Sequence, residues 1–197
     1  ANPTDTGAGG EVVGNYATLN PVDSKGTIQL SNGNLDVTAS GWATVLSTIA
    51  LPLGKTYLEF TYNGGSYGQI GVSEGPATKI SLTGEDAFNW AYNITAGVKV
   101  HNASSASWGI AGTSGDVFML AVDLSIGSGS NKIWWGKNGT WFNSGNPVTG
   151  ANAAYTNLTN QLLFAVSTNG TSYTSNFGQR AFAYTAPSGY KSLNTAN

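Results

Sequence analysis

Alternating apolar and polar residues predict short β-strands along most of the chain, because successive side chains of a strand point to opposite faces of its sheet. Leu58, Phe60 and Tyr62, for example, share one face of such a strand, and the residues between them share the other. Strands are predicted at residues 27–31, 35–39, 42–50, 55–62, 67–73, 117–124, 132–137, 140–142, 162–167 and 172–177, with weaker signals at 88–93 and 98–101.

Two segments indicate how these strands are arranged. Residues 117–124 are almost continuously apolar, as expected for a central strand that is covered on both faces. Asn138 and Gly139 separate two aromatic strands and are the residue pair that favours a type I′ hairpin turn, in which both residues have positive φ. We therefore predict an antiparallel hairpin at this point.

The 197 residues are consistent with one all-β domain, since β-sandwiches of this length commonly fold as a single unit. Residues 1–26 are predicted to be a polar lead-in that packs on the domain, and residues 27–197 the domain itself. The first residue is not Met and the last residues are polar, so we expect a fragment of a longer chain.

Composition excludes several classes of function. Only 9% of the residues are charged, and the eight Lys and Arg are scattered, so no basic stripe is expected to bind nucleic acid. The absence of cysteine excludes disulfides and thiolate metal sites. No run of 18 apolar residues predicts a membrane span, and no signal peptide is apparent.

Four stretches carry a family resemblance through their order. They are residues 54–60 (Gly-Lys-Thr-Tyr-Leu-Glu-Phe), 69–72 (Gln-Ile-Gly-Val), 115–139 with its Lys-Ile-Trp-Trp-Gly-Lys-Asn-Gly block, and 176–194. Together they resemble the SPRY domain family, particularly the form found in tailed-phage and prophage proteins. The chain departs from the family pattern at Thr56, where the family has Trp, and at Gly127–Ser130, which enlarges a turn.

The resemblance implies a bent sandwich of two antiparallel β-sheets, similar to lectin-like and jelly-roll-like sandwiches, with recognition through loops on one rim. The expected function is a non-catalytic recognition or adhesion module of a phage or virion-surface protein, such as a tail fibre, located on a virion or an extracellular surface. Its partner would be a host-surface protein or a glycan. The alternative is a structural scaffold that binds a neighbouring virion or cell-surface protein, because a fold does not determine its ligand.

Candidate ligand contacts are expected where strand periodicity is weakest, in residues 84–108. We predict that this segment forms exposed rim loops, because two tryptophans among small polar residues are typical of binding loops. The candidate binding residues are Tyr67, Trp90, Tyr92, His101 and Trp108.

No catalytic residue, metal ligand or cofactor is predicted. Residues 71–75 match the Gly-x-Ser-x-Gly pattern of hydrolases around Ser73, and Asp86 and His101 follow in order, but no helix is predicted after the serine to orient it. A glycan-active hydrolase is therefore disfavoured. The acidic residues are dispersed, and Asp123 is interpreted as a turn residue that accepts backbone hydrogen bonds.

Overall fold

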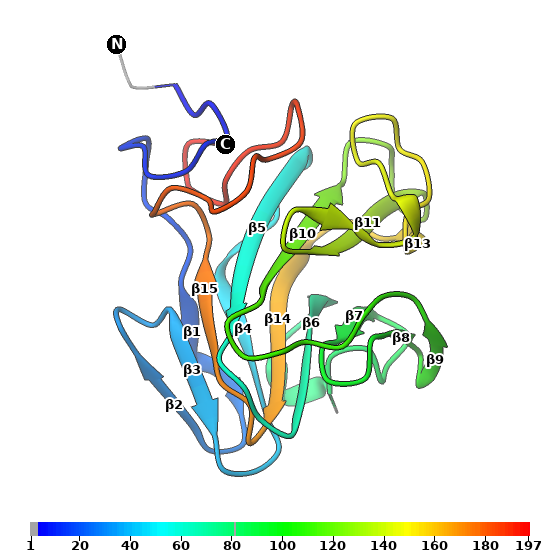
Figure 1. The fold of residues 1–197 in the computed structure, drawn as a ribbon. Coiled ribbons are helices and arrows are strands. Elements are labelled where there is room, and N and C mark those ends of the chain that lie inside the picture. Colours follow the sequence, from blue (N-terminus) through cyan, green and yellow to red (C-terminus); the bar gives the residue numbers. More distant parts are fainter. Residues whose placement is uncertain (1–3, 81) are drawn as a thin grey trace.

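The computed structural model describes residues 4–80 and 82–197 as two antiparallel β-sheets packed face to face (Figure 1). The predicted all-β sandwich is confirmed. In the described residues, helical structure is limited to two 3₁₀ turns, η1 (Ala77–Lys79) and η2 (Phe142–Ser144). No helix in residues 4–80 and 82–197 is long and apolar enough to cross a membrane.

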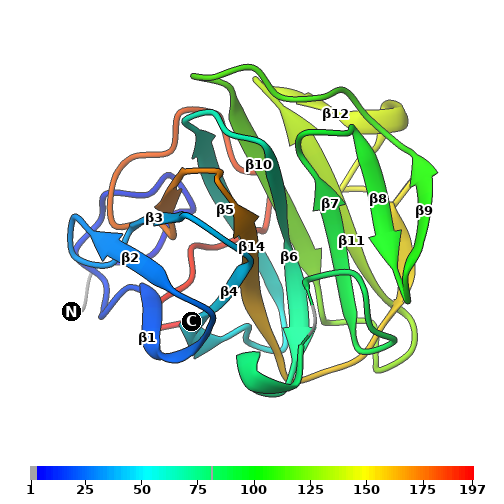
Figure 2. The same cartoon turned by 90° about the horizontal axis from the view of Figure 1, so that it is seen from below.

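The first sheet has seven strands in the order β1-β4-β14-β6-β7-β8-β9 (Figure 2). Its strands are β1 (Leu19–Lys25), β4 (Ala43–Ala50), β14 (Leu162–Asn169), β6 (Tyr67–Glu74), β7 (Asn89–Asn93), β8 (Val98–His101) and β9 (Ser104–Ser107).

The second sheet has eight strands, seven of them in the order β12-β11-β10-β5-β15-β3-β2, with β13 paired to β11. Its strands are β12 (Thr140–Trp141), β11 (Asn131–Lys137), β10 (Val117–Asp123), β5 (Lys55–Tyr62), β15 (Tyr173–Asn176), β3 (Asp36–Ala39), β2 (Ile28–Ser31) and β13 (Tyr155–Leu158). Each strongly predicted strand is present within one or two residues of its expected ends.

The inner faces of the two sheets form the main core. Phe60 of β5 and Phe164 of β14 come from opposite sheets, and their rings stack with centroids 4.2 Å apart and an interplanar angle of 8°. Strand β10 lies between β11 and β5 and is buried from Phe118 to Asp123, as its continuous apolar sequence predicted. Burial of these faces is the main favourable contribution to folding.

The prediction of exposed loops at residues 84–108 is wrong, because this segment forms β7, β8 and β9 and widens the first sheet. Strand β7 is buried on both faces, since its Asn89 and Asn93 are enclosed as fully as its aromatic residues. Strand β9 has the sequence Ser-Ser-Ala-Ser and is entirely exposed, so no apolar alternation marks it. Neither the continuous burial of β7 nor the full exposure of β9 gives the alternation of apolar and polar residues from which strands are predicted.

The predicted lead-in contains a strand that the pattern did not show. Strand β1 pairs with β4, and an irregularity between Leu19 and Ser24 interrupts its register. Pro21 and this irregularity remove the alternation that identifies a strand. Further upstream, the buried side chain of Asp5 accepts hydrogen bonds from Ser192 and Asn194, which attaches the N-terminal segment to the C-terminal one.

The predicted hairpin turn at Asn138 and Gly139 is confirmed. Asn138 has φ of 49° and Gly139 has φ of 83°, as a type I′ turn requires, and the turn connects β11 to β12. A Cβ atom built on Gly139 would lie 2.9 Å from the ring of Tyr184. Both the backbone conformation and the close ring therefore select glycine.

We predict that Gly139→Val lowers the free energy of unfolding by at least about 1 kcal/mol, because a side chain in the left-handed region is strained. Urea denaturation would measure the change. Gly54→Val is the matched control, since Gly54 has no positive φ and open space around its Cβ position. Coinciding denaturation midpoints for Gly139→Val and the wild type would refute the strain argument.

Candidate functional site

Two of the predicted binding residues, Trp90 and Tyr92, belong to the core instead. Their exposed fractions are 2% and 0%. The indole nitrogen of Trp90 donates to Oδ1 of Asn157 at 3.1 Å, and the Tyr92 hydroxyl donates to the backbone oxygen of Ile110 at 2.9 Å. Burial raises the pKa of the Tyr92 hydroxyl, despite that hydrogen bond. Their ring faces are covered by other side chains, so the expected exposure of these two residues is wrong.

His101 and Trp108 lie on the same side of the first sheet, at its β8–β9 edge. The His101 ring stacks on Trp90 with centroids 4.9 Å apart. The ammonium of Lys99 lies 3.9 Å from the Trp108 ring centroid and 4.8 Å from that of Tyr155. Burial lowers the pKa of Lys99. This cluster is half-buried, and its aromatic faces are already largely occupied by one another and by Lys99.

Tyr67 lies on the opposite, outer face of the first sheet, where it meets a tryptophan that sequence reasoning missed. Trp42 is 54% exposed, and its ring contacts Tyr67 edge to face with centroids 4.8 Å apart. Trp42 directly precedes β4, whereas the sequence pattern predicts that it begins this strand. The one available signal was its position immediately after Ser40 and Gly41, at the end of a turn.

A row of buried polar side chains lies beside this aromatic pair. Cross-strand register aligns Thr44 of β4 with Ser167 of β14, Ser167 with Gln69 of β6, and Gln69 with Asn93 of β7. The four residues are between 0% and 6% exposed. They lie on the outer face and are not part of the main core, and Thr83 covers this polar floor by donating its backbone N–H to Oγ of Ser167 at 2.8 Å.

Hydrogen bonds connect the floor to the aromatic pair. The Gln69 side-chain nitrogen donates to the Tyr67 hydroxyl at 2.8 Å, while its Oε1 has no hydrogen-bond partner among the described residues. Burial and the negative charge of Glu85 raise the pKa of Tyr67, against the effect of a hydrogen bond with Asn93. Tyr67 therefore keeps its proton at neutral pH. We call the exposed Trp42 and the half-buried Tyr67, together with the buried Gln69 and Asn93 beside them, the Trp42 face.

The Gly-x-Ser-x-Gly match does not form a catalytic triad. Ser73 is fully buried in β6, opposite Asn89, whereas the preceding residue Val72 lies opposite Trp90, which in turn lies opposite His101. Neighbouring residues of a strand point to opposite faces, so Ser73 and His101 project from opposite sides of the sheet. The serine hydroxyl donates to the backbone oxygen of Glu74 at 3.1 Å.

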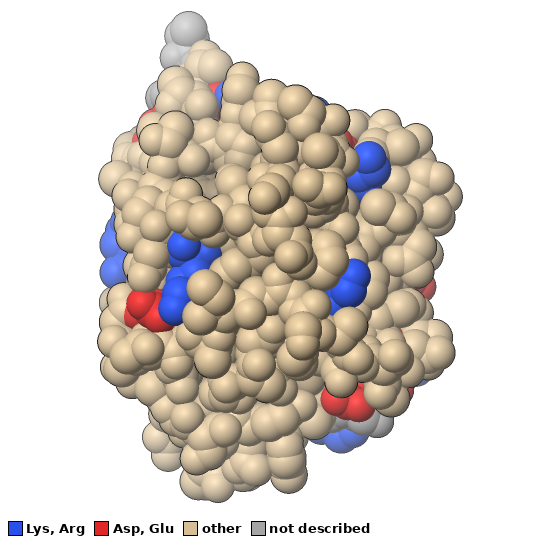
Figure 3. Space-filling model, turned by 45° about the vertical axis from the view of Figure 1, so that its right-hand side comes forward, with Lys and Arg blue, Asp and Glu red and all other residues tan. Residues whose placement is uncertain are grey.

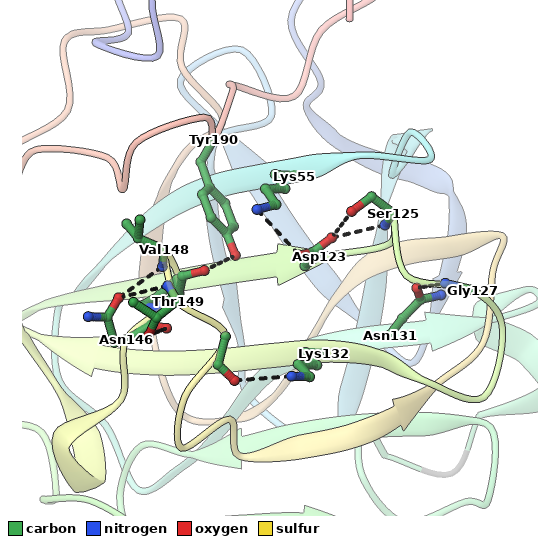
Figure 4. Close-up of polar contacts among 12 residues, drawn as sticks. Lys55, Asp123, Ser125, Gly127, Asn131, Lys132, Asn146, Val148, Thr149 and Tyr190 are labelled. Atoms are coloured by element: carbon green, nitrogen blue, oxygen red, sulfur yellow. Dashed lines mark hydrogen bonds and ion pairs between the residues drawn. The ribbon is translucent and has the colours of Figure 1, made fainter.

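Asp123 has the structural role that its sequence context predicted. Its Oδ1 accepts hydrogen bonds from the backbone N–H of Ser125 at 2.9 Å and from the hydroxyl of the same residue at 2.6 Å (Figure 4). Its Oδ2 lies 3.7 Å from the ammonium of Lys55. These contacts form the turn that follows β10.

Glu59 borders a hollow of about 240 Å³ on the outer face of the second sheet, but its carboxylate is fully engaged. It accepts hydrogen bonds from the Tyr57 hydroxyl at 2.8 Å and from the backbone N–H groups of Ala183 and Tyr184 at 2.7 and 2.9 Å. The carboxylate therefore holds the C-terminal segment on the sheet, and it is not free to bind a ligand.

Charged groups are sparse on the surface. Figure 3, in which the right-hand side of Figure 1 comes forward, shows isolated Lys, Arg, Asp and Glu side chains on a mostly uncharged face. Only two ion pairs occur within the described residues, Lys55–Asp123 and Lys137–Asp116. Recognition on such a surface depends on shape, aromatic area and hydrogen bonds more than on long-range attraction.

No protein-family model and no curated protein sequence matches the chain. Solved structures do. The SPRY domain of human HERC1 superimposes with a TM-score of 0.64 at 18% identity, over 80% of this chain and 96% of that one. A human SPRY domain gives 0.62 at 14% identity, over 78% and 96%. Stonustoxin gives 0.60 at 18% identity, over 82% of this chain and 27% of the toxin. The chain therefore has the SPRY fold.

We predict that Trp90→Ala lowers the free energy of unfolding by roughly 3–5 kcal/mol, because it leaves a cavity in the core. Trp42→Ala should lower it by no more than about 1.5 kcal/mol, the value of one edge-to-face aromatic contact. Thermal and urea denaturation of both variants would measure the difference. Equal losses would show that Trp42 is a packing residue.

Proposed function

We propose that the protein is a non-catalytic recognition module that binds its partner through the Trp42 face. The observation that carries this proposal is the exposure of Trp42 beside Tyr67, above a row of polar side chains. Trp42 is 54% exposed, so more than half of the surface of this large residue is available to a ligand. Tryptophan and tyrosine are also the residues that most often dominate binding energy at interfaces.

A protein is the partner class that the fold favours, because SPRY domains are generally protein-binding modules. A glycan is the other ligand class that we propose, since the exposed ring of Trp42 can stack on a sugar. The resemblance to phage SPRY sequences supports a host-surface partner and a place on a virion or extracellular surface.

The alternative function, a structural scaffold within an assembly, has one observation in its favour. Strand β9 forms an edge of the first sheet, and its four residues are exposed and uncharged. An unprotected edge can pair with a strand of another chain. If the protein acts through β9, Ser105→Pro should abolish binding while Trp42→Ala has no effect.

A glycan array and a panel of immobilised host envelope proteins would identify the ligand of the labelled domain. With that ligand, we expect Trp42→Ala to weaken binding by about 2 kcal/mol, roughly thirtyfold, as for a central interface tryptophan. Trp141→Ala is the matched control, because this half-buried indole lies in β12 of the other sheet. Unchanged affinity in a folded Trp42→Ala variant would exclude the Trp42 face.

A further inference from the structure

A second hollow lies close to the Trp42 face, at the end of the sandwich where β4, β6 and β15 begin (lower end of Figure 1). Loops 40–42, 63–66 and 170–172 meet there, and we call them the lower rim. The backbone N–H of Gly170 donates to the oxygen of Ala39 at 3.0 Å, and that of Ser172 donates to the oxygen of Gly64 at 3.0 Å. The rim therefore connects the two sheets.

The hollow is on the second-sheet side of the rim and has a volume of about 320 Å³. This volume is at the lower end of the range for small-ligand pockets, about 300–1,000 Å³. Its lining consists of Gln29, Leu30, Ser31, Asp36, Val37, Thr38, Asn63 and Ser172. No Lys, Arg or His is among these residues, so the hollow contains one negative charge and no positive charge.

The carboxylate of Asp36 has no partner in the described residues. Its Oδ1 is cut off from solvent and accepts no hydrogen bond, although Ser31 and Thr174 lie directly across from Asp36 in the neighbouring strands. A carboxylate oxygen in this situation loses the hydration that stabilises it in water, and it destabilises the folded protein unless something compensates its charge. The charge of a carboxylate is shared between its two oxygens, so a cation in the hollow can compensate it through Oδ2 without reaching the covered Oδ1.

The other polar groups that line the hollow favour an ammonium group as this cation. Asn63 uses its side-chain nitrogen to donate to Oγ1 of Thr174 at 3.1 Å, which leaves its carbonyl oxygen as an acceptor. Calcium would require more carboxylates than the single Asp36 provides. A guanidinium would gain most from two accessible carboxylate oxygens, whereas Oδ1 of Asp36 is covered. An ammonium can donate to one carboxylate oxygen and to neutral acceptors around it.

We propose that the Asp36 hollow binds a lysine side chain of a partner protein. Three residues separate Thr38, in the hollow, from Trp42, on the other side of the lower rim, so one partner can reach both. The identity of that partner rests on the proposed recognition function, but binding of lysine in the hollow is a property of Asp36 and its surroundings. The proposed recognition function and the proposed lysine site can therefore be refuted separately.

The test uses the full chain, labelled with ¹⁵N, and the acetylated and amidated peptide Gly-Ser-Lys-Ser-Gly. NMR titration would follow the side-chain amide signals of Asn63 and Gln29, which line the hollow. We expect saturable shifts of these signals that weaken as salt is added. Acetylation of the peptide lysine and the Asp36→Asn variant should each weaken binding at least about tenfold, the typical effect of losing a hydrogen bond to a charged group.

Two controls separate binding from folding. Glu74→Gln removes a carboxylate that borders a different hollow, and it should leave the titration unchanged. Asp36→Asn should not lower the melting temperature, because the carboxylate it removes has no partner to lose. A clear loss of stability in Asp36→Asn would show that the carboxylate is compensated within the protein, and would overturn the proposal.

Other outcomes also decide the question. The proposal is wrong if the lysine peptide causes no shift at Asn63 and Gln29, or if the acetylated peptide or Asp36→Asn binds equally well. Trp42→Ala should leave this titration intact, because the short peptide need not reach the Trp42 face. A lysine titration that fails, while Trp42→Ala still weakens the full ligand, would refute only the Asp36 site and leave the proposed function standing.

Discussion

The rest of the structure depends on packing between the inner faces of the two sheets. Phe60 and Phe164 stack across the interface, and Phe177 meets both rings edge to face. Side chains alternate along a strand, so burying one set of positions sends the other set outward. A shift of one residue in β6, for example, would exchange Val72 for Gly71 or Ser73. The core thus determines which side chains a partner can meet.

The outer face of the first sheet shows how that constraint places the residues of the proposed recognition surface. The inward positions of β6 are apolar, and its outward positions are Tyr67, Gln69, Gly71 and Ser73. Cross-strand register then places Gln69 in line with Ser167 and Asn93 without any requirement from the core. A row of buried amides and hydroxyls contributes little net stability, because its hydrogen bonds replace others made with water.

The candidate site required information that alternation does not contain. Trp42 precedes β4 and Tyr67 begins β6, and the two rings come together only because β4 and β6 both pair with β14 in the first sheet. The composition around Tyr67 predicts a binding residue, but no such pattern marks its neighbour Trp42. Trp90 and Tyr92 have the same local composition as a binding loop, yet they are buried because β7 lies between β6 and β8 rather than at a rim. Composition alone cannot distinguish an aromatic residue that faces solvent from one that faces a second sheet.

Local sequence by itself determined the all-β class, the positions of the strongly alternating strands and the turn at Asn138 and Gly139. Each of these depends on neighbouring residues, through side-chain periodicity or through the φ angles that Asn and Gly tolerate. Tertiary structure decided the order of strands, the role of the exposed β9 as a sheet edge, and the separation of Tyr67 from His101 onto opposite faces. These features depend on contacts between residues far apart in the chain, and the energy of such contacts is not encoded in any single segment.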